Sequence, residues 1–182
     1  MKDKPALYFM TTCALMAALM CALGPLSVPI GPVPVTLTNL VIYLSVWLLG
    51  AKGATVSVLL YLLLGAVGLP VFSGFQGGLA KLVGPTGGYL VGFLFVAFLG
   101  GLTVEKTKAN LPLTILGLIG GTALLYLLGT IWFMVQTGSD LGRAMTLCVY
   151  PFIPFDLGKI LLASVAGMLI RKALSKSNLL PV

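Results

Sequence analysis

Two charged side chains lie close together at the start of the last apolar segment of this chain. Asp156 and Lys159 are three residues apart, so in a helix both would project from one face. Pro151 and Pro154 fit a helix start, because the N–H group that proline lacks would be unpaired there anyway. The sequence therefore predicts a helix with Asp156 in its first turn, where the helix dipole favours a negative charge.

Charged groups at the edge of a membrane segment need a reason to be there. On insertion scales, a carboxylate or an ammonium costs about 2.5–3.5 kcal/mol near the bilayer centre and less toward the interface. One interpretation is a ligand site, in which Asp156 accepts and Lys159 donates hydrogen bonds to a polar ligand head. The other is a structural ion pair between helices. These two residues alone leave both interpretations open.

The composition is that of an integral membrane protein. Of the 182 residues, 59% are hydrophobic and 8% are charged, whereas a soluble domain has about 25% charged residues. We therefore expect the chain to lie in or beside the lipid bilayer, with no soluble domain of any size. Basic residues outnumber acidic ones by 11 to 4, but their distribution along the chain indicates membrane orientation rather than nucleic-acid binding.

The residues needed for catalysis are scarce. The chain has no His, and Cys13, Cys21 and Cys148 lack the spacing of metal ligands, so we interpret them as packing residues. An enzyme would need a nucleophile with a base, or a metal cluster. The chain also contains no GxxxxGK[ST] motif for a nucleotide. We predict no catalytic residue, no metal site, no cofactor and no nucleotide site.

Six apolar segments predict an all-α membrane protein that forms a single domain over residues 1–182. The segments cover residues 7–23, 35–49, 54–69, 89–102, 111–135 and 154–170. The first resembles a signal peptide in length, but five further segments follow it, so we expect a retained helix. A proline-rich loop at 24–34, a tight turn at 50–53 and polar loops at 103–110 and 136–146 would separate the helices.

The second segment is unusually polar. Thr36, Asn39 and Tyr43 recur at helical spacing and would share one face, which should contact protein or a cavity rather than lipid. Hydrogen bonding between helices and contact with a ligand explain this face equally well.

The connection over residues 70–88 is rich in glycine and keeps Phe72, Phe75, Gln76 and Lys81 between its glycines. Long loops without regular structure are usually functional or disordered, and this one is too apolar for disorder. The pattern suggests a lid over a pocket.

The basic residues predict an orientation. If both ends of the chain lie in the cytoplasm, that side carries Lys2, Lys4, Lys52, Lys106, Lys108, Arg171, Lys172 and Lys176. The outside carries only Lys81 and Arg143, with Lys159 set aside as intramembrane. This asymmetry follows the positive-inside rule. The glycine-rich connection and the start of the last helix would then face outside, where Asp156, Lys159 and Gln76 can meet.

Four stretches resemble the BioY family, the biotin-specific substrate-binding (S) components of energy-coupling factor (ECF) transporters. They are residues 33–36 (VPVT), 62–71 (LLLGAVGLPV), 77–89 (GGLAKLVGPTGGY) and 152–159 (FIPFDLGK). The resemblance covers nearly the whole chain. It implies a bundle of six transmembrane helices, with a pocket near the extracellular face where Asp156 and Lys159 contact the bicyclic head of biotin and Gln76 lies beside it.

The chemistry of these residues suits biotin. A ureido ring presents two N–H groups and one C=O, which a carboxylate and an ammonium can bind, and Phe72, Phe75 and Tyr89 could pack against the apolar part. With Asn39 from the polar face, the expected ligand-binding residues are Asp156, Lys159, Gln76, Tyr89, Asn39 and Phe72. The chain departs from the family pattern at Phe155, where Gly is usual, and at Thr38, where Gln is frequent. Phe155 would either narrow the pocket or face lipid.

Small residues form a stripe on the first segment. Ala14, Ala18 and Ala22 repeat every four residues, so another helix could approach closely. Packing within the bundle explains the stripe as well. The resemblance implies that Ala14 and Ala18 contact a transmembrane coupling subunit, which acts with two ATPase subunits in the cytoplasmic membrane of a prokaryote.

The alternatives to a biotin-specific S component are an S component for another vitamin and a structural membrane subunit without a ligand.

Overall fold

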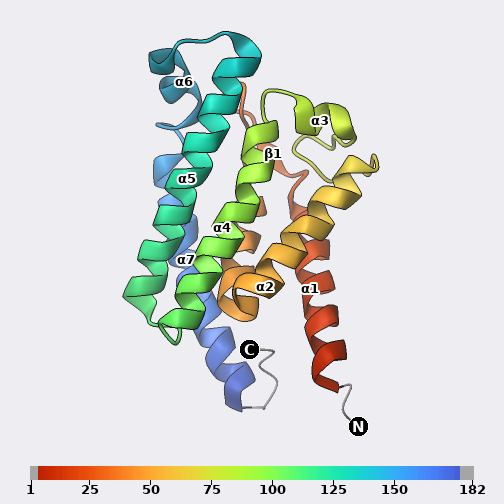
Figure 1. Ribbon diagram of the computed structural model, residues 1–182, viewed down its shortest axis with the longest axis vertical. Coiled ribbons are helices and arrows are strands. Elements are labelled where there is room, and N and C mark those ends of the chain that lie inside the picture. The colour runs from red at the N-terminus through yellow and green to blue at the C-terminus, as the bar shows by residue number, and fades with distance from the viewer. Residues whose placement is uncertain (1–3, 177–182) are drawn as a thin grey trace.

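The computed structural model describes residues 4–176 as a mainly helical bundle (Figure 1). In chain order its elements are α1 (Lys4–Leu23), β1 (Ser27–Val28), β2 (Val35–Thr36), α2 (Thr38–Ala66), α3 (Leu79–Val83), α4 (Gly87–Lys106), α5 (Leu111–Thr137), α6 (Leu141–Cys148) and α7 (Ile153–Lys176). Helices α2, α4, α5 and α7 are long and apolar enough to cross a membrane, and α1 contains the shorter apolar stretch Leu7–Leu23. A mainly helical membrane protein is therefore confirmed. Lys2, one of the basic residues expected on the cytoplasmic side, lies outside the described residues.

Helix α2 changes direction at Gly50, whose backbone (φ 65°, ψ −164°) is non-helical. The expected four-residue turn at 50–53 is wrong, because a single glycine tolerates the positive φ that the bend requires and the chain is helical again from residue 51. Figure 1 shows the two halves of α2 diverging from this bend. The count of six separate helices is not confirmed: residues 4–176 contain seven helices, and two of the expected segments are halves of α2.

Two charged residues from other helices hold this bend. The Glu105 carboxylate accepts a hydrogen bond from the Ala51 N–H (2.7 Å), and the Arg171 guanidinium donates one to the carbonyl of Trp47 (2.8 Å). The break leaves amides unpaired at the start of the second half of α2 and carbonyls unpaired at the end of the first half. An acid at the amide end and a base at the carbonyl end also complement the two helix dipoles.

The second apolar segment begins with a strand instead of a helix. Val35 and Thr36 pair with Val28 and Ser27 in an antiparallel ribbon, and α2 starts only at Thr38. The β-branched pair after Pro34 favours this extended backbone. The predicted helical face of Thr36, Asn39 and Tyr43 is therefore wrong for Thr36, which lies outside α2.

Short helices occupy two stretches that were expected to be loops. Helix α3 lies in the glycine-rich connection, and α6 lies in the polar stretch 136–146 and beyond it. Helix α6 has an N-cap at Asp140, whose carboxylate accepts a hydrogen bond from the Arg143 N–H (3.1 Å). Such a cap satisfies an amide that the first helical turn leaves free.

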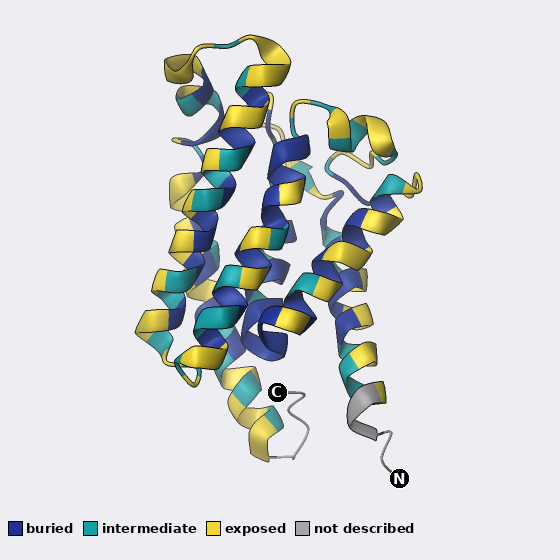
Figure 2. Ribbon diagram, viewed as in Figure 1, coloured by how far each residue is buried: buried dark blue, intermediate teal, exposed yellow. Residues whose placement is uncertain are grey.

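The core lies where α2 packs against α1, α4 and α7, and α4 packs against α5. Figure 2 shows the buried faces of α2 and α4 in the middle of the bundle. Tyr43, Trp47 and Tyr61 are the largest fully buried side chains. Large apolar side chains also cover the outside, such as Leu116 at 62% exposure, as expected of helices that face lipid.

Candidate ligand-binding site

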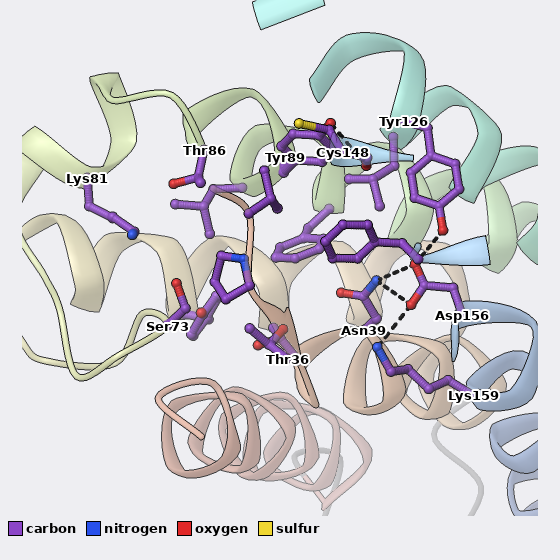
Figure 3. Close-up of a pocket in the computed structure, with 18 residues that line it drawn as sticks. Thr36, Asn39, Ser73, Lys81, Thr86, Tyr89, Tyr126, Cys148, Asp156 and Lys159 are labelled. Atoms are coloured by element: carbon purple, nitrogen blue, oxygen red, sulfur yellow. Dashed lines mark hydrogen bonds and ion pairs between the residues drawn. The ribbon is translucent and has the colours of Figure 1, made fainter. Parts of the chain in front are cut away.

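A pocket lies at the end of the bundle where α3, α6 and the start of α7 are found (Figures 1 and 3). Its residues come from elements far apart in the sequence, from β2 and α2 to α7. Figure 3 shows polar side chains at both ends of the pocket, and residues such as Leu90, Phe93, Leu125 and Phe152 supply apolar lining. Apolar walls with a few placed polar groups are typical of small-molecule sites.

One end of the pocket is built around the carboxylate of Asp156, which is 2% exposed. It lies in the first turn of α7, as predicted, and its N–H donates to the carbonyl of Phe152 (2.8 Å). Three side chains donate to its oxygens: the Asn39 amide (3.3 Å to each oxygen), the Tyr126 hydroxyl (2.7 Å) and the Lys159 ammonium (2.9 Å). These donors offset the cost of burying the charge.

Asp156 and Lys159 form their ion pair within α7, between residues i and i+3. The ion pair that the structural alternative places between two helices therefore lies within one helix, while hydrogen bonds from Asn39 and Tyr126 join Asp156 to α2 and α5. Both side chains also line the pocket. A charged pair at a pocket wall presents an acceptor and a donor side by side.

Asn39 and Tyr89 line the same pocket, and both are held by neighbouring elements. Asn39 is in the first turn of α2 and binds Asp156. The Tyr89 hydroxyl lies 3.2 Å from Oγ1 of Thr130 and donates to the carbonyl of Cys148 (3.4 Å). The structure thus brings four of the six predicted ligand-binding residues together.

Gln76 and Phe72 are not among the residues that line this pocket. Their backbones form an antiparallel bridge around a tight turn at Gly74 and Phe75, both with positive φ. The Gln76 side chain is exposed. Phe72 is fully buried and packs edge-on against Tyr61 (5.5 Å between ring centroids). Tyr61 lines the pocket, so Phe72 supports the pocket wall through its contact with Tyr61.

Tyr126 is not among the ligand-binding residues that the sequence predicts, although the sequence contains a signal for it. Thr122, Tyr126 and Thr130 repeat every four residues in an otherwise apolar helix and therefore share a face. Their oxygens contact Tyr43 (2.8 Å), Asp156 (2.7 Å) and Tyr89 (3.2 Å) respectively. This stripe positions the site from α5.

The two departures from the family pattern lie in different surroundings. Phe155 is 49% exposed and does not line the pocket, so it does not narrow the pocket. Thr38 is 1% exposed and belongs to the pocket lining.

The alanine stripe of α1 faces outward. Ala14, Ala18 and Ala22 are exposed, whereas Cys13 and Ala17 on the opposite side are buried against the bundle. The stripe is therefore free of packing within the described residues of this chain.

Comparisons of sequence and of structure both find biotin transport proteins to be similar to this chain. The model of the BioY family matches residues 1–176. The chain is 39% identical to biotin transporter BioY2 of Lactococcus lactis subsp. cremoris, over 94% of each chain. It is 41% identical to biotin transporter BioY of Thermotoga maritima, over 81% of this chain and 86% of that one. A solved crystal structure, described as the S-component for biotin from an ECF-type ABC transporter, has a TM-score of 0.87 and 34% identity over 94% of this chain and 95% of that chain.

Proposed function

Because this chain belongs to the BioY family, we propose that it is the S component of a biotin transporter and binds biotin in the pocket around Asp156. The observation that carries this proposal is the buried carboxylate of Asp156, held by three donors at one end of a pocket with apolar and aromatic lining. The function is uptake, and biotin leaves the site chemically unchanged.

The polar end of the pocket suits the ureido ring. The Asp156 carboxylate can accept from a ring N–H, and the neighbouring Lys159 ammonium can donate to the ring carbonyl. Asn39 and Tyr126 fix the direction of the carboxylate through their own hydrogen bonds. Phe93 and Phe152 line the pocket and provide apolar surface for the rest of the bicyclic ring.

We further propose that the chain crosses the cytoplasmic membrane six times, with both termini in the cytoplasm. The crossings are α1, the two halves of α2, α4, α5 and α7. The length and composition of the long helices support this arrangement, and the charge asymmetry of the loops supports the orientation.

The proposed binding function can be tested by titrating biotin into the purified protein. Asp156→Asn should weaken binding by about 2–5 kcal/mol, the range for truncating one member of a buried charged contact. Asp140→Asn is a matched control, because Asp140 caps α6 outside the pocket and Asn caps a helix equally well. Wild-type affinity in folded Asp156→Asn protein would refute this site. Binding of a different vitamin, and not biotin, would refute the assigned ligand.

If ATP hydrolysis drives uptake, partner subunits must supply it, since the chain has no nucleotide motif. We propose that the exposed stripe of Ala14 and Ala18 on α1 contacts a transmembrane coupling subunit, which acts with two ATPase subunits. Small residues on an exposed helix face allow close helix approach.

Ala14→Trp and Ala18→Trp should block co-purification with the coupling subunit and energised uptake, while biotin binding to the isolated chain persists. Ala123→Trp is the control, because Ala123 is an exposed small residue on a different membrane helix, α5. Retained assembly in both α1 variants, or loss of assembly in the control alone, would contradict this interface.

A further inference from the structure

The pocket carries one positive charge more than it carries negative charges. Its charged lining residues are Lys81, Asp156 and Lys159. Asp156 and Lys159 neutralise one another across 2.9 Å. Among the side chains that the structure describes, those of residues 7–176, this is the only ion pair, so Lys81 has no carboxylate partner there. The net charge of the lining is therefore +1.

Lys81 lies at the end of the pocket away from Asp156. Figure 3 shows its ammonium directed toward the pocket, near Ser73 and Thr86 and opposite the cluster of Asn39 and Asp156. The residue belongs to α3, in the glycine-rich connection, and is half-buried. Burial lowers the pKa of this ammonium, because a charge without a counter-ion is costly away from water.

We propose that Lys81 recognises a carboxylate at the tail end of the ligand, with the hydroxyls of Ser73 and Thr86 beside it as further donors. This assignment rests on the proposed function, because biotin carries its hydrogen-bonding head and its carboxylate at opposite ends. The head is held by a pair whose charges cancel, so the head end does not select for ligand charge. The tail end selects for it through a cation that only the ligand neutralises.

The experiment compares biotin with biotinamide, its neutral isostere, on the same purified protein. Wild-type protein should prefer biotin by about 10-fold to 100-fold, the value of a hydrogen bond between charged groups. Lys81→Gln should lower biotin affinity and leave biotinamide affinity nearly unchanged, so the preference collapses to about 1 to 3. Lys81→Arg should retain most of the preference.

Two further variants separate the possible causes. Asp156→Asn should weaken both ligands equally and keep their ratio, because it acts on the head. Arg143→Gln should change neither, because Arg143 is an exposed cation on α6 that does not line the pocket. It therefore controls for long-range attraction of an anion.

Three results would overturn the assignment. Equal wild-type affinity for biotin and biotinamide would mean that the carboxylate is not recognised. Equal losses for both ligands in Lys81→Gln would mean that Lys81 only supports the loop. Wild-type protein that binds neither ligand would refute the proposed function itself, which is a distinct result from a wild type that binds both ligands without preference.

Discussion

The phenol oxygen of Tyr126 lies 2.7 Å from Oδ2 of Asp156 and joins the middle of α5 to the first turn of α7. Asn39 makes the corresponding connection from α2. The carboxylate is thus fixed by helices on different sides of the pocket, before any ligand is present. A binding group that is already oriented loses less conformational entropy when the ligand arrives.

Removing the Tyr126 hydroxyl should therefore affect stability as well as binding. We expect Tyr126→Phe to lower the free energy of unfolding by about 1.5–3 kcal/mol, because the buried carboxylate loses a hydrogen bond. Tyr150→Phe is the control, since Tyr150 is 58% exposed. Denaturation of the detergent-solubilised proteins measures the free energy of unfolding of both variants. Equal losses in Tyr126→Phe and Tyr150→Phe would contradict the role of Tyr126.

Asp156 and Lys159 should be strongly coupled. Lys159→Met leaves a buried carboxylate without its counter-ion, which should cost about 3–5 kcal/mol of stability. Asp156→Asn leaves Lys159 without its partner. The double variant Asp156→Asn/Lys159→Met should lose less stability than the sum of the two single losses, since it removes both charges together. Additive losses would show that the two charges do not depend on one another.

The bend in α2 should require glycine. At Gly50 the backbone has φ +65°, and a Cβ atom there would collide with the Glu105 carboxylate. Gly50→Ala should therefore destabilise the protein by about 1–3 kcal/mol. Gly120→Ala, where a Cβ meets nothing within 4 Å, should instead stabilise helix α5 by about 0.5–1 kcal/mol. The free energy of unfolding of both variants tests this difference. A loss of stability in Gly120→Ala but not in Gly50→Ala would contradict the prediction.

Membrane sidedness can be tested by cysteine labelling with a membrane-impermeant reagent. Cysteines at Lys106 and Lys176 should react from the cytoplasmic side and one at Arg143 from outside. Arg143 is a suitable outside position, because its side chain is exposed on α6. The native Cys13 and Cys148 are buried, and half-buried Cys21 should first be changed to Ala. Labelling of positions 106 and 143 from one side would contradict the six crossings.

Local spacing explains which parts of the site the sequence could predict. Asp156 and Lys159 are neighbours on one helical turn, so their pairing needs no knowledge of the fold. Tyr126 reaches Asp156 from 30 residues away, and only the repeat of Thr122, Tyr126 and Thr130 indicated an inward polar stripe. The motif around Gln76 predicts a position at the pocket, but the turn at Gly74 and Phe75 leaves the Gln76 side chain exposed.

The fold was predictable where length and hydrophobicity decide it. Runs of apolar residues indicated the long helices correctly, because a helix satisfies its own backbone hydrogen bonds in lipid. The bend at Gly50 was harder, since it depends on Glu105 and Arg171 from other helices. Helix α6 had a readable signal in its cap at Asp140, but its short length and polar surroundings resemble a loop.

The bend divides α2 into two helical arms that meet at Gly50. Asn39 and Tyr61, which both line the pocket, lie eleven residues before and eleven residues after Gly50. At about 1.5 Å per residue each arm is about 16 Å long, so a change of about 10° at the apex moves one tip by about 3 Å relative to the other. A change in the bend would therefore change the separation of two residues of the pocket wall, and the hydrogen bonds from Glu105 and Arg171 hold that bend in the middle of α2.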